Sequence, residues 1–180
     1  MTRLPAPAPP AAAVWAAWAR LGVLVGAPPA AHTPDPVELL LQTAAATPGC
    51  PRLPGLAATW LSRFGDAVNA GALSERLRRE RAYGGAFPAA VTGWVLDAAL
   101  AAGGAASLRG PAAAAGRLSP PRLLFDVDAL SPAAGSYAAH EADAASLGRG
   151  LYASTPVIRP KVLRPASWVR EHNPTLFPRT

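Results

Sequence analysis

Proline and glycine restrict this chain to short secondary-structure elements. There are 21 prolines and 16 glycines among its 180 residues, and they are spread along most of the sequence. Proline ends or kinks a helix because it lacks an N–H and clashes with the preceding turn, and glycine lowers helix stability. We therefore expect a mainly α protein, a small helical bundle with a helix-turn-helix-like core, in which any β structure is a minor element.

The chain is long enough for one domain with its own core and an appended tail. Apolar residues make up 51% of it, and many of these are alanines, which bury little area. The five tryptophans are therefore expected to carry much of the packing. We divide the sequence into a proline-rich tail (1–10), a helical domain (11–154) and an extended, basic C-terminal arm (155–180).

Local signals mark where several helices begin and end. A first helix is expected over residues 11–21, and a second over residues 36–46, where Asp35 can cap the helix and Pro36 suits its first position. Another helix should open near Pro88 and end at the Gly103-Gly104 pair. Residues 107–116, rich in alanine, suit either a short helix or a loop.

The sequence predicts the secondary structure of two later segments less clearly. Residues 122–130 have leucine and valine at helical spacing, but Phe125, Val127 and Ala129 would equally line one face of a strand. Both readings stay open. Residues 137–152 read as a helix that Gly148 and Gly150 weaken.

Residues 54–82 contain the pattern of two amphipathic helices joined by a tight turn. The first has one apolar face, formed by Leu56, Trp60, Leu61, Phe64 and Val68. Since glycine takes the left-handed conformation without a steric clash, we expect the first helix to end at Gly65 in that conformation.

The second helix of this pair follows the turn formers Asp66 and Asn69, which are candidate N-caps. Leu73 and Leu77 should form its inward edge. Its flanks and outer face carry the arginines Arg76, Arg78, Arg79 and Arg81. In a helix-turn-helix protein the second helix enters the major groove of DNA, so these side chains are candidate contacts to bases or phosphates.

A simpler interpretation of the same helix requires no DNA. Glu75 precedes Arg79 by four residues, and Arg76 precedes Glu80 by four, so both can form ordinary surface pairs that contribute about 0.2–0.5 kcal/mol each. The arginines would then belong to the solvated face of a helical hairpin. The sequence leaves both interpretations open.

Overall charge favours an acidic partner, with nucleic acid first. The net charge is +6, and Lys161 is the one lysine among 17 basic residues. Such a preference for arginine, together with abundant Ala, Pro and Gly, is also typical of a GC-rich genome, which weakens the inference from charge alone.

Residues 155–180 are rich in proline and basic side chains. Pro160 and Pro165 exclude a regular helix before Ala166, so the segment should run extended, anchored by Val157, Val162 and Leu163, with a helical turn near residues 167–173.

Two functions fit the C-terminal arm. Its basic residues suit phosphate contacts, and its aromatic residues suit a protein interface. The candidates for phosphate are Arg159, Lys161 and Arg164, and the candidate anchors for a protein partner are Trp168 and Phe177. A third interpretation is that the arm is a structural strap: its aliphatic side chains pack against the helices, and its charged groups stay in water.

No catalytic, cofactor or metal motif stands out, so the sequence predicts a protein without enzymatic activity, cofactor or bound metal. A magnesium site at Asp126 and Asp128 ranks last among the hypotheses, because no spacing here matches a known ligand set. Cys50 is the only cysteine, which excludes an intrachain disulfide and favours the reducing cytoplasm. No stretch is apolar and long enough to predict a membrane span.

Three segments carry a resemblance to a known group of proteins. They are DPVELLL (35–41), WLSRFGD (60–66) and RPKVLRP (159–165). In these the chain resembles small bacterial proteins similar to the antitoxin-like, winged-helix partners of nucleotidyltransferase toxins. The resemblance implies a DNA-binding, autoregulating protein whose protein partner is a toxin, although no β-hairpin pattern for a wing follows the candidate recognition helix.

Overall fold

The computed structural model describes residues 10–24, 34–82, 86–118, 125–126, 151–152 and 156–178. Within these ranges the chain forms seven α-helices and two short strands, which confirms the prediction of a mainly α, small helical bundle. The elements, in chain order, are α1 (Ala11–Arg20), α2 (Pro36–Ala46), α3 (Leu53–Phe64), α4 (Ala70–Ala82), α5 (Ala86–Ala101), α6 (Arg109–Leu118), β1 (Phe125–Asp126), β2 (Leu151–Tyr152) and α8 (Ala166–His172).

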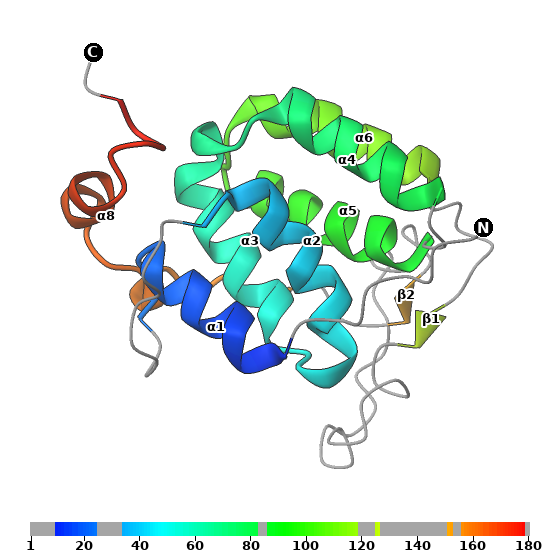
Figure 1. The fold of residues 1–180 in the computed structure, drawn as a ribbon, viewed down its shortest axis with the longest axis horizontal. Coiled ribbons are helices and arrows are strands. Elements are labelled where there is room, and N and C mark those ends of the chain that lie inside the picture. The colour runs from blue at the N-terminus through cyan, green and yellow to red at the C-terminus, as the bar shows by residue number, and fades with distance from the viewer. Residues whose placement is uncertain are drawn as a thin grey trace.

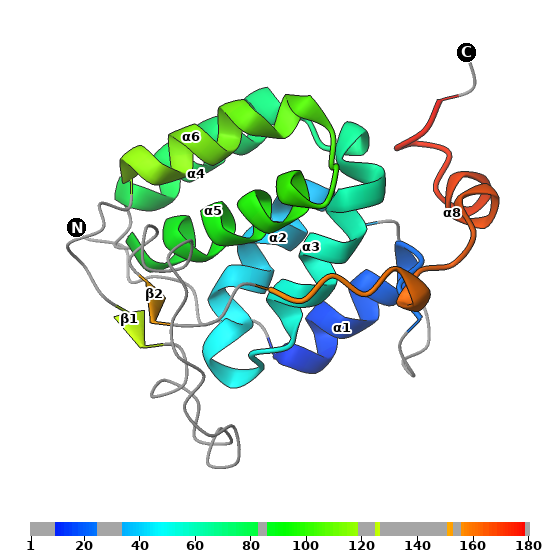
Figure 2. The same cartoon turned by 180° about the vertical axis from the view of Figure 1, so that it is seen from behind.

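Helix α5 lies at the centre of the bundle. It packs against α6, α3 and α2, and α1 covers α2 from the other side. Helices α4 and α6 lie side by side and form a layer over α5 (Figures 1 and 2). Residues 89–96 of α5 are buried on every side of the helix, and apart from Thr92 this segment is apolar all round rather than amphipathic.

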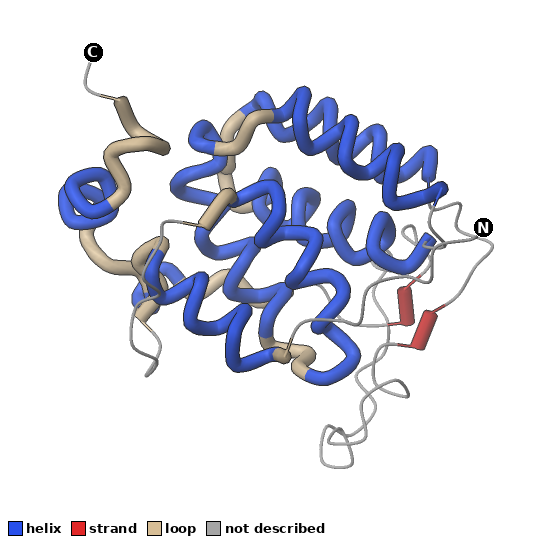
Figure 3. The backbone as a smooth tube through the Cα atoms, in the orientation of Figure 1, coloured by secondary structure: helices blue, strands red, loops and turns tan. Residues whose placement is uncertain are grey.

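Strands β1 and β2 form a parallel pair at one end of the bundle (Figure 3). Phe125 pairs with Leu151 and Asp126 with Tyr152. The open question over residues 122–130 is therefore settled as a strand at Phe125–Asp126, and the remainder of that segment lies outside the described residues. The helix predicted over 137–152 is wrong at Leu151–Tyr152, where the ladder to β1 replaces it; residues 137–150 are not described.

Of the five tryptophans predicted to pack the core, Trp18, Trp60 and Trp94 are buried, and Trp15 and Trp168 are half-buried against it. Trp18 and Trp60 are fully buried, with ring centroids 5.8 Å apart. Each indole N–H has a partner: Trp18 Nε1 donates to Thr43 Oγ1 and Trp60 Nε1 to the Leu21 carbonyl, both at 2.9 Å. These bonds satisfy polar groups that would be costly to bury alone, and they tie α1 to α2 and α3.

Helix starts follow the local signals. Asp35 Oδ1 accepts from the Val37 N–H at 2.9 Å with Pro36 at the first helical position, and Asn69 Oδ1 accepts from the Ala72 N–H at 2.9 Å. The predicted caps of α2 and α4 are therefore present.

The backbone conformation of Gly65, in the α3–α4 turn, differs from the one predicted. It is right-handed, with φ −63° and ψ −19°, and it begins the 3-10 turn η2 (Gly65–Ala67). The left-handed conformation expected there is wrong. A Cβ at this position would lie 2.7 Å from Leu108 Cδ1, so a side chain here would force the buried Leu108 in the turn η3 (Ala106–Leu108) to shift. Glycine is therefore favoured here by the available space and not by the backbone conformation.

Candidate nucleic-acid interface

Helix α4 is the element that presents the predicted arginines. Leu73 and Leu77 on its inner side are fully buried, as expected, and the helix packs mainly against α6 and more lightly against α5. The exposed positions of its outer side include Gly71, Ala72 and Arg78. One face of α4 therefore belongs to the core and the other faces water.

The side chain of Arg76 forms an ion pair with α2. Its Nη2 lies 2.5 Å from Glu38 Oε2 on α2, and its side chain is 39% exposed. The ion pair connects α4 to α2 and holds the guanidinium at the side of the helix. The side chain of Glu80, predicted to pair with Arg76, lies outside the described residues.

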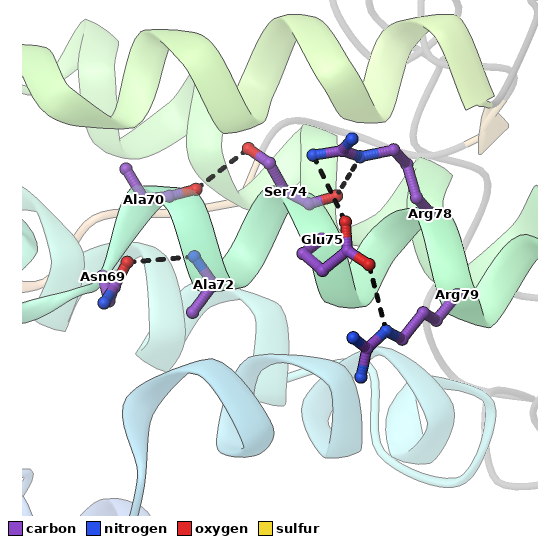
Figure 4. A network of polar contacts seen from close by, with 7 residues as sticks. All are labelled: Asn69, Ala70, Ala72, Ser74, Glu75, Arg78 and Arg79. Carbon is purple, nitrogen blue, oxygen red and sulfur yellow. Dashed lines mark hydrogen bonds and ion pairs between the residues drawn. The ribbon is translucent and has the colours of Figure 1, made fainter.

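Arg78 and Arg79 face solvent on the outer side of α4 (Figure 4), with side chains 63% and 62% exposed. Both pair with Glu75: Arg79 Nε lies 3.1 Å from Oε1, and Arg78 Nη2 lies 3.5 Å from Oε2. Arg78 Nε also donates to the Ser74 carbonyl at 3.2 Å. The predicted Glu75–Arg79 surface pair is thus present, and the side chain of Arg81 lies outside the described residues.

The basic residues of the C-terminal arm lie elsewhere. Arg159, Lys161 and Arg164 are exposed, as the strap interpretation expects. The arm runs along α3 and α1, and α8 lies on the side of the bundle away from the C-terminal end of α4 (Figures 1 and 2). The structure therefore does not bring these residues together with the arginines of α4 into one surface.

Backbone contacts fasten the arm to the bundle. Val23 and Leu163 form an antiparallel bridge, flanked by hydrogen bonds from Leu24 N–H to the Val162 carbonyl (2.5 Å) and from Arg164 N–H to the Gly22 carbonyl (2.8 Å). These bonds make the arm an additional strand-like segment along the end of α1.

Two buried side chains of the arm and one further backbone N–H complete this attachment. Leu163 and Val169 are buried, and the Arg159 N–H donates to Thr59 Oγ1 of α3 at 3.0 Å. Val157 is 60% exposed, so the prediction that it is an anchor is wrong, and the neighbouring Pro156 is buried instead.

Trp168 has contacts within the arm and with Gly22, just after α1. Its ring stacks with His172 at 4.0 Å between centroids, the Arg164 guanidinium lies 4.5 Å from its centroid, and it borders Gly22. Arginine over an indole is a favourable cation–π arrangement.

Phe177 likewise contacts its own chain. It meets Phe64 edge-on at 5.9 Å and lies beneath Arg170. The structure thus places both predicted partner anchors, Trp168 and Phe177, half-buried in intramolecular contacts.

Arg117 is a basic residue that the sequence analysis missed. It lies in the last turn of α6, and together with Arg78 it lines a depression of about 550 Å³ between α4 and α6. The other described residues that line it are Ser74, Gly110, Ala114 and Leu118. In the sequence, Arg117 is simply a basic residue near the end of an alanine-rich segment. That pattern does not indicate that α4 and Arg78 lie next to it.

Nothing in the described part of the chain forms a metal centre: no three His, Cys, Asp or Glu residues cluster there. Asp128 is outside the described residues, as is the side chain of Asp126, so the magnesium hypothesis stays a prediction. Across the same ranges, no helix has the length and apolar character needed to cross a membrane.

Comparisons with protein-family models, with curated proteins and with solved structures find no match for this chain. The resemblance to antitoxin-like winged-helix proteins therefore stays a prediction.

Proposed function

We propose that this protein binds duplex DNA, without enzymatic activity, through the outer face of α4. The observation that supports this most directly is the position of Arg78 and Arg79, whose side chains are 63% and 62% exposed on a helix whose inner face is fixed in the core. An arginine held in this way offers planar, bidentate donors to phosphate or guanine without any rearrangement of the fold.

Glu75 does not prevent such contacts. Ion pairs between exposed side chains contribute only about 0.2–1 kcal/mol, so a DNA phosphate can compete for either arginine. Glu75 instead limits the freedom of both guanidinium groups before binding, because it contacts both of them.

The shape of α4 suits the major groove. At 13 residues it is about 20 Å long, and the groove is about 12 Å wide, enough to admit a helix. Near its start the exposed positions carry only Gly71 and Ala72, which let the helix backbone approach closely. The short η2 turn after α3 is the connection expected in a helix-turn-helix.

A regulatory role, as in an antitoxin-like protein, rests on the sequence resemblance alone. The alternative function, capture of a protein partner such as a toxin by the C-terminal arm, gains no support from the contacts of Trp168 and Phe177, because both side chains are engaged within the chain. DNA binding is therefore the function that we propose.

Fluorescence-anisotropy titration with random duplex DNA at two salt concentrations tests the proposal. The wild-type protein should bind at low salt and weaken steeply as salt rises, because phosphate contacts release counterions. In Arg78→Ala/Arg79→Ala, affinity should fall and the slope of log K against log salt should decrease by about two.

A matched control removes the same charge elsewhere. Arg63 and Arg170 are exposed arginines on α3 and α8, and the double variant Arg63→Ala/Arg170→Ala should retain most of the affinity. Equal losses in the two double variants would show that only net charge matters. Absence of binding by the wild type at low salt would refute the proposed function.

A further inference from the structure

The depression between α4 and α6 is formed by two helices that lie far apart in sequence but side by side in the bundle. Ser74 and Arg78 line it from α4, and Gly110, Ala114 and Arg117 line it from α6. Its volume is about 550 Å³, and it is a half-open hollow on the surface rather than an enclosed cavity.

Among the described residues that line it, two are arginines and none is acidic, although Arg78 also pairs with Glu75. Arg78 and Arg117 contribute two guanidinium groups, and among the described residues the side chain of Arg117 has no hydrogen-bond or ion-pair partner. Gly110 leaves open space, since nothing lies within 4 Å of the position that a Cβ would take there. A group that enters the depression therefore meets two guanidinium groups, Leu118 and otherwise small side chains.

The helix dipole explains the position of only one of the two arginines that line the depression. A basic side chain in the last turn of a helix interacts favourably with the partial negative charge of that end, and this explains Arg117 alone. It does not explain why Arg78 of a different helix lines the same depression. Two arginines around one concave surface are suited to a phosphate, because each presents a fork of N–H donors.

We propose that this depression holds a backbone phosphate of the bound DNA, with Arg78 and Arg117 as its ligands. The inference rests on the proposed function and adds α6 to the interface. Arg79, on the same exposed face of α4, would then contact the groove or the neighbouring phosphate while Arg78 and Arg117 fix the position of one strand. Phosphate contacts of this kind set the register of a protein on DNA without reading sequence.

The first test compares two variants of α6 that lose the same charge. Arg117→Ala should lower the affinity for random duplex DNA several-fold and reduce the salt slope by about one. Arg109→Ala, an exposed arginine of α6 that does not line the depression, should change both quantities less. Equal effects of Arg117→Ala and Arg109→Ala would overturn the proposal.

A second variant fills the depression and leaves the charge unchanged. Gly110→Leu places a side chain in open space, so the fold should tolerate it, and DNA affinity should nevertheless fall as in Arg117→Ala. Circular dichroism and thermal unfolding would confirm that both variants are folded. A folded Gly110→Leu variant with wild-type affinity would contradict the proposal.

A second probe separates this inference from the proposed function. Inorganic pyrophosphate, titrated into the ¹⁵N-labelled full chain, should shift the Nε–Hε signals of Arg78 and Arg117, and Arg117→Ala should abolish the shift of Arg78. If these shifts occur but the wild type binds no DNA, the depression is a phosphate site and the DNA-binding function is refuted. If DNA binds through Arg78 and Arg79 but neither signal moves and Arg117→Ala binds normally, the function stands and the depression is excluded.

Discussion

Arg76 on α4 and Glu38 on α2 form an ion pair, with Nη2 and Oε2 2.5 Å apart. The pair spans 38 residues of sequence and holds the side of α4 against the bundle. Among the described arginine side chains of α4, Arg76 therefore contacts another helix, whereas Arg78 and Arg79 pair with neighbours on their own helix.

Replacement of Arg76 should affect stability more than DNA binding. Because both partners are partly exposed, Arg76→Ala should lower the free energy of unfolding by about 0.2–1 kcal/mol. A urea-denaturation double-mutant cycle with Glu38→Gln measures the coupling, and anisotropy measures DNA affinity. A larger loss of affinity than in Arg78→Ala would place Arg76 in the interface after all.

Gly65→Ala should destabilise the fold although its backbone is right-handed. The new Cβ would lie 2.7 Å from Leu108 Cδ1, and overpacking of this kind costs about 1–3 kcal/mol. Thermal or urea unfolding measures the loss. In combination with Leu108→Ala the two effects should be less than additive, since the smaller side chain removes the clash; strict additivity would contradict this explanation.

Gly22 should be essential for docking of the C-terminal arm. Its φ is +96°, and a Cβ there would lie 2.4 Å from Val169 Cγ2, so Gly22→Ala combines backbone strain of about 1–3 kcal/mol with a clash against α8. Limited proteolysis should cut the arm faster in this variant. Gly49→Ala is the matched control, because nothing lies within 4 Å of its Cβ position, and it should leave the arm protected.

Asn69 should stabilise the helix that carries the candidate interface. Its Oδ1 accepts from the Ala72 N–H, so Asn69→Ala should lower the free energy of unfolding by about 0.5–2 kcal/mol. Asn69→Asp retains the acceptor and should be close to wild type. Chemical denaturation compares the two variants, and equal stability of Asn69→Ala and wild type would show that the cap contributes nothing.

Local signals predicted the helices well because their causes are local. Asp35 and Pro36 start α2, and Asn69 starts α4, through side-chain and backbone preferences of the residues themselves. The prolines of the arm likewise delay its helix until Ala166. The strand pair β1–β2 was not predictable to the same degree, since Phe125 depends on Leu151 as its ladder partner.

The candidate site was predicted in its residues but not in its geometry. Sequence periodicity places Leu73 and Leu77 inside and Arg78 and Arg79 outside, because a helix of 3.6 residues per turn separates them. It does not show that Arg76 meets Glu38, or that the basic residues of the arm lie away from α4.

By itself the sequence determined the helical class, the main helix boundaries and the amphipathic character of α4, since these follow from capping, proline and periodicity. The tertiary structure decided that the available space favours Gly65, that Arg117 lies across a depression from Arg78, and that the arm is fastened to Gly22 and Thr59. Each of these depends on which surfaces pack together over long sequence separations, and packing of this kind is set by the shape of the whole core rather than by neighbouring residues.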